Sequence, residues 1–227
     1  MKKLITPLIL MLLYVTTGMS CLKENPPYVT VDGIHYAYDG REIWICGFEA
    51  EQDSVVLPHQ VMFKGKTTDI KTICIVKSPS PRVLVVPDGY LTITELNLPR
   101  LEKLYISKSV ELLHDRCTSE HAHIKCEKLK AIIVDNNNKH FRSIDGILYS
   151  KDKLHLLKYP PMKEGKAFTI PSHVKGINIG AFTDCHLEKI YYPKSKDVLS
   201  YAPFETEDME YLQDITGIGD KVKLLPK

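Results

Sequence analysis

Histidine and cysteine, the two residue types best suited to bind zinc, gather in one short stretch of the sequence. Imidazole nitrogens and thiolate sulfurs are both good zinc ligands, and the stretch contains His114, Cys117, His121, His123 and Cys126. Their spacing, H-x2-C-x3-H-x-H-x2-C, matches no zinc signature of known geometry. We therefore expect a solvated loop without a metal, and no cofactor elsewhere. A metal-dependent enzyme built on this loop is the least favoured alternative.

The two cysteines of this stretch have a second use that the sequence leaves open. Outside the cytoplasm, Cys117 and Cys126 could form a disulfide, because oxidising compartments allow such bonds to persist. The spacing of the remaining cysteines does not decide their pairing.

Hydrolytic catalysis through a covalent intermediate needs a nucleophile, a base and an orienting group that meet in space. None of the cysteines or histidines lies in a recognisable catalytic signature. Ser80 and Ser172 follow or precede strand-entry and proline-rich segments, without the sharp turn of a nucleophile elbow. The sequence therefore predicts that the protein is not an enzyme.

Residues 1–20 have the layout of a secretory signal, with two lysines, an apolar run over residues 4–15 and then small residues. The apolar run is too short to span a membrane comfortably. Removing this segment takes away two lysines and no acidic residue, so that 28 basic and 28 acidic side chains remain. A neutral exported protein is a poor candidate for binding nucleic acid, which requires a basic surface. We expect no nucleic-acid partner.

The end of the signal predicts a lipid anchor. Residues 18–21, Gly-Met-Ser-Cys, resemble a bacterial lipobox, in which the cysteine is lipidated and becomes the first residue of the mature protein. Gly18 stands where an aliphatic residue is usual. Acyl chains on Cys21 would hold the protein at a membrane, with residues 21–27 as a proline-containing tether. The alternative is an ordinary cleaved signal followed by a stray cysteine.

Apolar residues recur in a pattern that predicts stacked strands. The closing part of the pattern, most complete in residues 168–193, has two apolar residues spaced two apart, which point to one face of a short strand. An opening part, apolar-Pro-x2-apolar or a variant of it, precedes each closing part at a distance of 13 to 23 residues. The closing patterns are Ile70/Ile73/Ile75, Leu101/Leu104/Ile106, Leu129/Ile132/Val134 and Leu187/Ile190/Tyr192. Single strands cannot bury such a face alone, so we expect them to stack in parallel as a solenoid.

Three segments of the repeat region carry a resemblance to a known family. Residues 126–141 (CEKLKAIIVDNNNKHF), 143–161 (SIDGILYSKDKLHLLKYPP) and 170–193 (IPSHVKGINIGAFTDCHLEKIYYP) resemble the BspA-like leucine-rich-repeat proteins, also called leucine-rich repeat type 5. Residues 191–201 (YYPKSKDVLSY) are similar to the usual C-terminal ending of that family. The resemblance implies a β-rich solenoid of irregular leucine-rich repeats, with a short-stranded parallel sheet interrupted and capped by β-hairpins. It also implies that Cys185 is a buried packing residue.

The same resemblance implies a location and a role. Members of the family are often surface lipoproteins of host-associated anaerobic bacteria, and adhesion to host matrix or to other bacteria is the role usually proposed for them. The expectation for this chain is therefore export, lipid anchoring to the outer membrane and exposure at the cell surface.

The absence of a long glycine- or serine-rich linker predicts one continuous domain over residues 28–227. Residues 28–48 alternate around an Asp-Gly dipeptide and predict an N-terminal hairpin cap. The repeats extend over residues 57–193, with a second hairpin at 144–160 where an Ile-Asp-Gly-Ile sequence echoes the first. Residues 194–227 are predicted to form a C-terminal cap.

The outward positions of the closing strands are the candidate binding face. Parallel stacking would line them into one stripe with two aromatic and basic pairs, a composition typical of recognition surfaces. The alternative is that tyrosine and isoleucine occur there only as good strand formers. The full set of outward positions is Thr72, Cys74, Lys103, Tyr105, Ala131, Ile133, Lys189 and Tyr191, and the candidate contact residues are Lys103, Tyr105, Ile133, Lys189 and Tyr191.

Taken together, these features predict a non-enzymatic lipoprotein of the cell envelope that binds a protein or a glycan through its strand face. The first alternative is a periplasmic or structural accessory lipoprotein, acting in glycan capture without a host partner.

Overall fold

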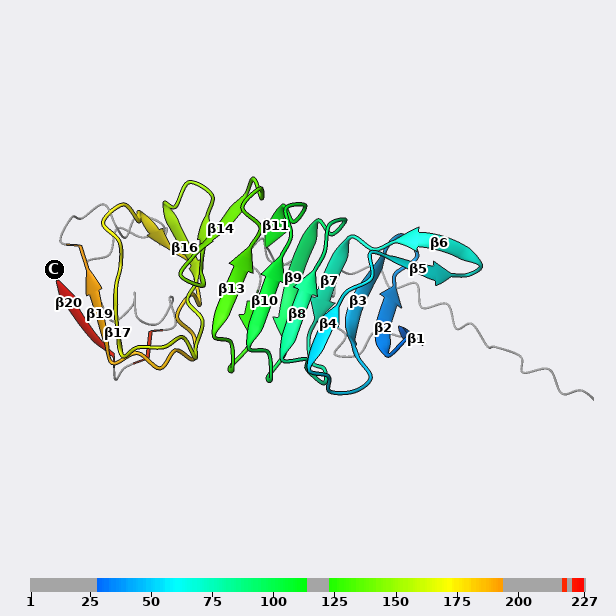
Figure 1. Ribbon diagram of the computed structural model, residues 1–227, viewed down its shortest axis with the longest axis horizontal. Coiled ribbons are helices and arrows are strands. Elements are labelled where there is room, and N and C mark those ends of the chain that lie inside the picture. The colour runs from blue at the N-terminus through cyan, green and yellow to red at the C-terminus, as the bar shows by residue number, and fades with distance from the viewer. Residues whose placement is uncertain (1–27, 114–122, 194–217, 220–221, 227) are drawn as a thin grey trace, which may run out of the picture.

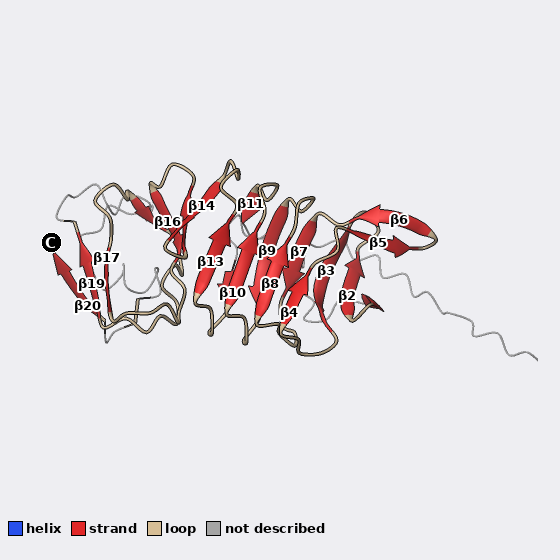
Figure 2. Cartoon of the chain, in the orientation of Figure 1, coloured by secondary structure: helices blue, strands red, loops and turns tan. Residues whose placement is uncertain are grey.

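The computed structural model describes residues 28–113, 123–193, 218–219 and 222–226, which form strands and turns without any helix (Figure 2). This part of the chain accordingly has no helix that is long and apolar enough to cross a membrane. Figure 1 shows the strands following one another along one long axis, with β1 near one end and β20 at the other. The predicted β-rich fold is confirmed. The strands are β1 Tyr28–Val31, β2 Ile34–Tyr38, β3 Ile43–Phe48, β4 Ser54–Val56, β5 Gln60–Phe63, β6 Lys66–Asp69, β7 Thr72–Ile75, β8 Val83–Val86, β9 Thr92–Asn97, β10 Lys103–Ile106, β11 Leu112–Leu113, β12 His123–Lys125, β13 Ala131–Val134, β14 Phe141–Ile144, β15 Ile147–Ser150, β16 His155–Lys158, β17 Ala167–Thr169, β18 Gly176–Ile177, β19 Lys189–Tyr192 and β20 Lys223–Pro226.

The first sheet begins antiparallel and becomes parallel. Strands β1, β2 and β3 pair antiparallel, β7, β9 and β11 follow in parallel, and β12 also pairs with β9. At the turn between β2 and β3, the Asp39 carboxylate accepts hydrogen bonds from the amides of Arg41 and Glu42, each at 2.9 Å. Gly40 has φ 99°, a value that glycine adopts readily because it has no Cβ. The Asp-Gly hairpin predicted from the sequence is therefore present, as part of a three-stranded antiparallel start.

The second sheet, in the order β4–β8–β10–β13, is parallel throughout. Lys103 of β10 pairs with Val83 of β8, and in the first sheet Leu112 pairs with Thr92, so that both pairs join residues about 20 positions apart. Lys103 also pairs with Ala131 of β13, and these two residues are further apart in the sequence because the chain between them contains an insertion. The chain thus alternates between the two sheets and places one strand in each of them per turn.

This alternation corrects the sequence interpretation of the repeat. One repeat, for example from Val86 at the end of β8 to its paired residue Ile106 in β10, contains two strands, β9 and β10, where the sequence interpretation has one. The sequence interpretation omits β9. The strands of the closing patterns also do not build one sheet, since β7 belongs to the first sheet and β19 to a separate one.

A continuous core lies between the two sheets. Inward side chains of the second sheet belong to the same buried cluster as those of the first, and each is inaccessible to solvent. Burying one leucine or isoleucine side chain stabilises the fold by about 1.5–3 kcal/mol relative to leaving it exposed. The residues concerned are Leu84, Leu104 and Ile132 in the second sheet, and Ile45, Ile73 and Ile93 in the first.

After β13 the stacking is interrupted by an antiparallel hairpin. Strands β14 and β15 pair around Asp145 and Gly146, which have φ values of 50° and 74°. β15 then pairs antiparallel with β16, and β18 adds to β16 in parallel. A second buried cluster begins here around Tyr149, Tyr159 and Phe182, and β17, β19 and β20 form a further parallel sheet.

Another antiparallel hairpin, β5–β6, extends away from the stacked turns near the first strands (Figure 1). Its turn residues, Lys64 and Gly65, both have positive φ, at 51° and 76°, as a tight two-residue hairpin requires. The sequence interpretation does not predict this hairpin and treats its residues as the irregular part of a repeat.

Candidate functional site

The exposed side of the second sheet carries part of the candidate binding face. In β10, Leu104 and Ile106 point into the core, and Lys103 and Tyr105 point outward, as alternation along a strand requires. Because the sheet is parallel and in register, outward residues of successive strands line up at the strand spacing of about 4.8 Å. One row is Ser54, Val83, Lys103 and Ala131, and the other is Val56, Val85, Tyr105 and Ile133.

The second of these rows, which we call the apolar row (Val56, Val85, Tyr105 and Ile133), crosses the whole sheet without a charged residue. Val56 is 64% exposed and Tyr105 is 37% exposed, whereas Val85 and Ile133 are half-buried. Apolar residues scattered singly over a surface need no explanation, but contiguous ones are typical of contact surfaces. The apolar row is contiguous across four neighbouring strands.

A row of alternating charge borders the sheet at the residue that precedes each strand. This charged row is Asp53, Arg82, Glu102 and Lys130, and backbone hydrogen bonds align its members. The Glu102 carboxylate accepts a hydrogen bond from Arg82 Nε and another from Lys130 Nζ, both at 2.8 Å. The hydrogen bonds from Arg82 and then Lys130 lower the pKa of Glu102 from 4.5 to about 2. The three side chains are therefore held together over a wide range of pH.

Sequence reasoning missed the charged row, although a signal for it exists. Arg82 and Glu102 are 20 positions apart, which is the interval between paired strands. Asp88 and Lys108 have the same spacing and form an ion pair of 3.1 Å from Oδ2 to Nζ. A search for opposite charges at the interval of the strands would have found both pairs.

The other predicted contact residues lie on a different sheet. Lys189 is exposed and Tyr191 is half-buried on β19, which pairs with β17 and β20. The structure therefore brings Lys103, Tyr105 and Ile133 together, and it places Lys189 and Tyr191 on a separate sheet.

Thr72 and Cys74 do not belong to the outward stripe either. Both lie on β7 of the first sheet. Thr72 is 3% exposed, and its hydroxyl donates a hydrogen bond to the Glu42 carboxylate. The prediction of one continuous stripe is wrong, because the closing patterns are distributed over several sheets.

Of the candidate metal-binding stretch, His123 and Cys126 fall within the described residues, and His114, Cys117 and His121 lie outside them. His123 is in β12 and pairs with β9. Cys126 is a free, buried thiol that donates a hydrogen bond to the Leu96 carbonyl at 3.5 Å. Burial raises its pKa to about 12, which favours the protonated, unreactive form.

The described residues contain no group of three or more histidine, cysteine, aspartate or glutamate side chains that could hold a metal ion. Ser80, considered above as a nucleophile, is buried, donates a hydrogen bond to the Pro81 carbonyl at 3.0 Å and accepts one from the Arg100 amide at 3.2 Å. Ser172 is exposed. Ser80 therefore has the surroundings of a structural residue.

Cys185 packs against the second buried cluster, although it is half-buried rather than fully buried as the resemblance implied. Burial raises the pKa of its thiol. Cys21, the predicted lipidation site, lies outside the described residues.

Comparison with known proteins finds likeness only among solved structures. No protein-family model and no curated protein matches the chain. Solved structures that match include the pneumococcal vaccine antigen PcpA (16% identity, TM-score 0.42, covering 73% of this chain and 64% of that chain). Two others are leucine-rich-repeat proteins, from Eubacterium ventriosum (18% identity, TM-score 0.40, covering 75% and 66%) and from Bacteroides ovatus (18% identity, TM-score 0.40, covering 73% and 49%).

This chain is thus similar to bacterial leucine-rich-repeat proteins, as its sequence motifs indicate. The matched region spans less than two thirds of each of the three solved chains. At these identities and TM-scores the likeness carries no inference about activity, partner or location.

Proposed function

We propose that this chain is a non-enzymatic leucine-rich-repeat solenoid that binds a protein partner through the exposed side of its second sheet. The observation that carries the proposal is the apolar row, together with the charged row at the start of the same four strands. In protein interfaces, an apolar centre supplies the burial of surface, and charged residues around it supply specificity and register. The two rows together have this composition.

The charged row is well suited to recognition because its side chains are already ordered. Glu102 bridges Arg82 and Lys130 through two hydrogen bonds of 2.8 Å. Long charged side chains normally lose rotamer freedom when a partner immobilises them, and this loss weakens binding. Here a large part of that ordering is present before the partner arrives.

The apolar row favours a protein over a glycan as the partner. Sugar hydroxyl groups need polar side chains as hydrogen-bond partners when they are buried. Tyr105 has a hydroxyl, but Val56, Val85 and Ile133 offer only aliphatic surface. An apolar protein segment complements such a row better than a carbohydrate does.

Binding can be tested with residues 22–227 on arrays of extracellular-matrix proteins and glycans. A Tyr105→Ser, Ile133→Ser double variant should lose about tenfold or more in affinity for a protein ligand, because truncation at the centre of an interface costs the most. The matched control, Lys189→Ala with Tyr191→Ser, alters β19 and should bind normally. Circular dichroism and thermal melting would establish that both variants are folded.

Two results would contradict the proposed site. The first is a control variant that loses binding as strongly as the double variant, which would spread the site over both sheets. The second is binding to glycans alone, which would replace the protein partner and favour the role in glycan capture.

Export and anchoring belong to the same proposal. Residues 1–20 would direct the chain across the membrane, acyl chains on Cys21 would anchor it, and surface display would allow adhesion. Protease treatment of intact cells tests this, with a soluble periplasmic protein as the marker of cell integrity. Loss of the protein while the marker survives is the expected result. Protection of both proteins would contradict surface adhesion and support a periplasmic accessory role.

A further inference from the structure

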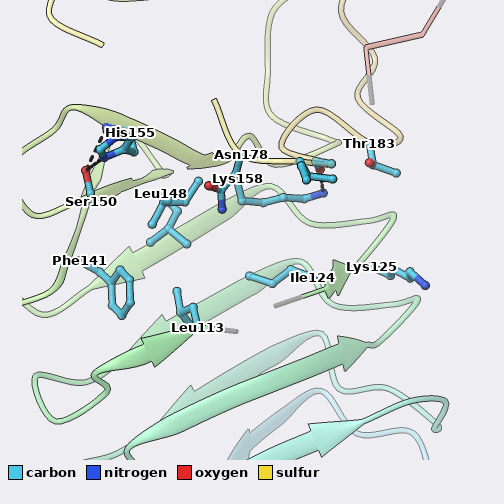
Figure 3. Close-up of a pocket in the computed structure, with 13 residues that line it drawn as sticks. Leu113, Ile124, Lys125, Phe141, Leu148, Ser150, His155, Lys158, Asn178 and Thr183 are labelled. Atoms are coloured by element: carbon cyan, nitrogen blue, oxygen red, sulfur yellow. Dashed lines mark hydrogen bonds between the residues drawn. The ribbon is translucent and has the colours of Figure 1, made fainter. Parts of the chain in front are cut away.

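A pocket of about 260 Å³ lies where the stacking of turns is interrupted (Figure 3). The first sheet ends at β11 and β12, and the next turn of the chain forms the antiparallel hairpin β14–β15–β16 instead of another parallel strand. The pocket is bounded by these two edges and by residues 178–183, which follow β18. The pocket is a separate site from the proposed protein-binding surface, because no residue of the apolar row lines it.

The pocket is apolar inside and basic at its wall. Figure 3 shows Leu113, Ile124, Phe141 and Leu148 gathered around the open space, with Lys158 and Asn178 beyond them. The polar lining includes two lysines and a histidine but no carboxylate. A ligand that matches this lining is apolar over most of its surface and negatively charged at one end. The apolar lining residues are Leu113, Ile124, Phe141, Leu148, Leu157 and Ile179.

Lys158 is a buried lysine that forms no direct ion pair within the described residues. It is 6% exposed, and its ammonium donates a hydrogen bond to the Gly180 carbonyl at 3.1 Å. Burial lowers the pKa of this lysine, and the exposed carboxylate of Asp184 opposes that effect only in part.

A buried ammonium group without a direct ion pair is well suited to bind an anionic ligand. It has three N–H donors, and the Gly180 carbonyl accepts from it in the part of the chain that the structure describes. Burying a charge without a counter-charge costs free energy, and a ligand carboxylate within hydrogen-bond distance would offset that cost.

Asn178 supplies a second polar group at the pocket. It is 8% exposed, and its backbone amide donates to the Leu156 carbonyl at 2.9 Å. Asn178 lines the pocket, and its side-chain NH₂ group is a donor of the kind that a ligand oxygen accepts. An ammonium and an amide NH₂ are both donors, which a carboxylate with two oxygens can satisfy.

We propose that this pocket binds a small monocarboxylate with an aliphatic or aromatic tail. The carboxylate lies against Lys158 and Asn178, and the tail lies among Leu113, Ile124 and Phe141. The volume fits about ten non-hydrogen atoms, since a cavity of about 150 Å³ accommodates benzene. Octanoate and 3-phenylpropionate are compounds of this size and chemistry.

Calorimetric titration of residues 22–227 tests the proposal directly. Octanoate and 3-phenylpropionate should bind, and octanamide, which has the same tail without the charge, should bind at least tenfold more weakly, because hydrogen bonds to charged groups are the stronger ones. Inorganic phosphate should not displace octanoate at an equal concentration, since it has no tail.

Variants assign the site within the protein. Lys158→Met keeps the length and apolar character of the side chain and removes its charge, so it should bind octanoate at least tenfold more weakly and no longer distinguish it from octanamide. Lys103→Met, on the exposed side of the second sheet, is the matched control and should bind octanoate normally. Asn178→Leu provides an independent variant of the head-group site and should weaken octanoate binding.

The outcomes that overturn the proposal are equally defined. Equal binding of octanoate and octanamide to the native protein would make the pocket a purely apolar site. Displacement by phosphate would make it a simple anion site, and absence of any binding at millimolar concentration would show that the pocket does not accept small molecules. A folded Lys158→Met variant with native affinity for octanoate would place the carboxylate elsewhere.

Discussion

Single polar side chains hold the turns of this molecule together, and Asn138 is the clearest example. It is fully buried, and its Nδ2 donates hydrogen bonds to the carbonyls of Ser107 at 2.8 Å and Val110 at 2.9 Å. Its Oδ1 accepts from the amides of His140 and Phe141, both at 2.8 Å. One side chain thus satisfies four backbone groups and connects the turn after β13 to the turn after β10.

Replacing Asn138 by alanine should destabilise the protein by about 2–4 kcal/mol, because several buried backbone groups lose their partners. Urea unfolding monitored by circular dichroism would measure the loss. Asn137→Ala is the matched control, since the Asn137 side chain is exposed and should change stability by less than about 0.5 kcal/mol. An equal effect of the two substitutions would mean that the hydrogen bonds of Asn138 contribute nothing specific.

The lowered pKa of Glu102 predicts that the charged row stabilises the folded protein less in acid. Its pKa in the folded protein is lowered from 4.5 to about 2 by hydrogen bonds from Arg82 and Lys130. Between these values the unfolded chain takes up a proton at this residue and the folded chain does not, so acid favours unfolding. The stabilisation is therefore complete above about pH 4.5 and is lost as the pH falls toward 2.

The urea midpoint of the native protein should accordingly fall more between pH 5 and pH 3 than that of a Glu102→Gln variant. Glu111→Gln removes an exposed carboxylate instead and should behave like the native protein. If Glu102→Gln and the native protein show the same pH dependence, the charged row does not couple to folding.

At the level of elements, the hairpins interrupt the stacked turns and depend on glycines with left-handed backbone. Gly146, in the β14–β15 turn, has φ 74°, and a Cβ placed there would lie 3.0 Å from the Cβ of Ala131. Gly65, in the β5–β6 turn, has φ 76°, but nothing lies within 4 Å of its Cβ position. The two positions share the backbone conformation and differ in the space around them.

Both Gly→Ala substitutions should be destabilising, because alanine is strained at positive φ by about 1–2 kcal/mol. Gly146→Ala should cost at least about 1 kcal/mol more than Gly65→Ala, since it also overpacks the contact with β13. Chemical denaturation of the two variants measures the difference. Equal losses would show that β14–β15 can move away from β13 without cost, and that the hairpin is only loosely joined to the stack.

The sequence predicts those elements best whose inward residues are apolar and two positions apart, as Leu104 and Ile106 are in β10. It fails for β9, where Thr94 is buried and its hydroxyl donates to the Ile73 carbonyl at 3.3 Å. A polar residue in the core breaks the apolar alternation, and the register shift beside Ile73 breaks the spacing. Local pattern alone cannot reveal a strand whose polar residue is satisfied by its neighbour.

The candidate site was predictable to the same limited extent. Lys103, Tyr105 and Ile133 lie together because β10 and β13 are adjacent and in register. Tyr191 has the same local pattern, but its strand belongs to another sheet, since the hairpin after β13 ends the second sheet. The pocket around Lys158 depends on how that hairpin meets β11 and β12, which no single segment of the sequence encodes.

At the scale of the whole molecule, the division into two buried clusters matters for stability. The first cluster extends from Ile34 to Leu148 and the second from Ile147 to Val222, so that β15 contributes to both. In stacked proteins, stability is approximately a sum of local terms and nearest-neighbour interfaces, and parts of a fold can open separately. The boundary at β14–β16 is therefore the place where we expect cooperativity to weaken.

Hydrogen exchange of paired variants tests this division. Leu156 and Leu104 are both fully buried, in the second and the first cluster respectively, and Leu→Ala at such positions typically costs about 2–5 kcal/mol. Leu156→Ala should accelerate amide exchange in β15–β19 and leave β7–β10 near native rates, whereas Leu104→Ala should accelerate exchange in β7–β13. If either substitution accelerates exchange equally from β2 to β19, the two clusters unfold as one unit. In that case the two clusters are coupled across the β14–β16 junction as strongly as neighbouring turns are elsewhere. The pocket at the junction would then be a packing defect within a single cooperative core.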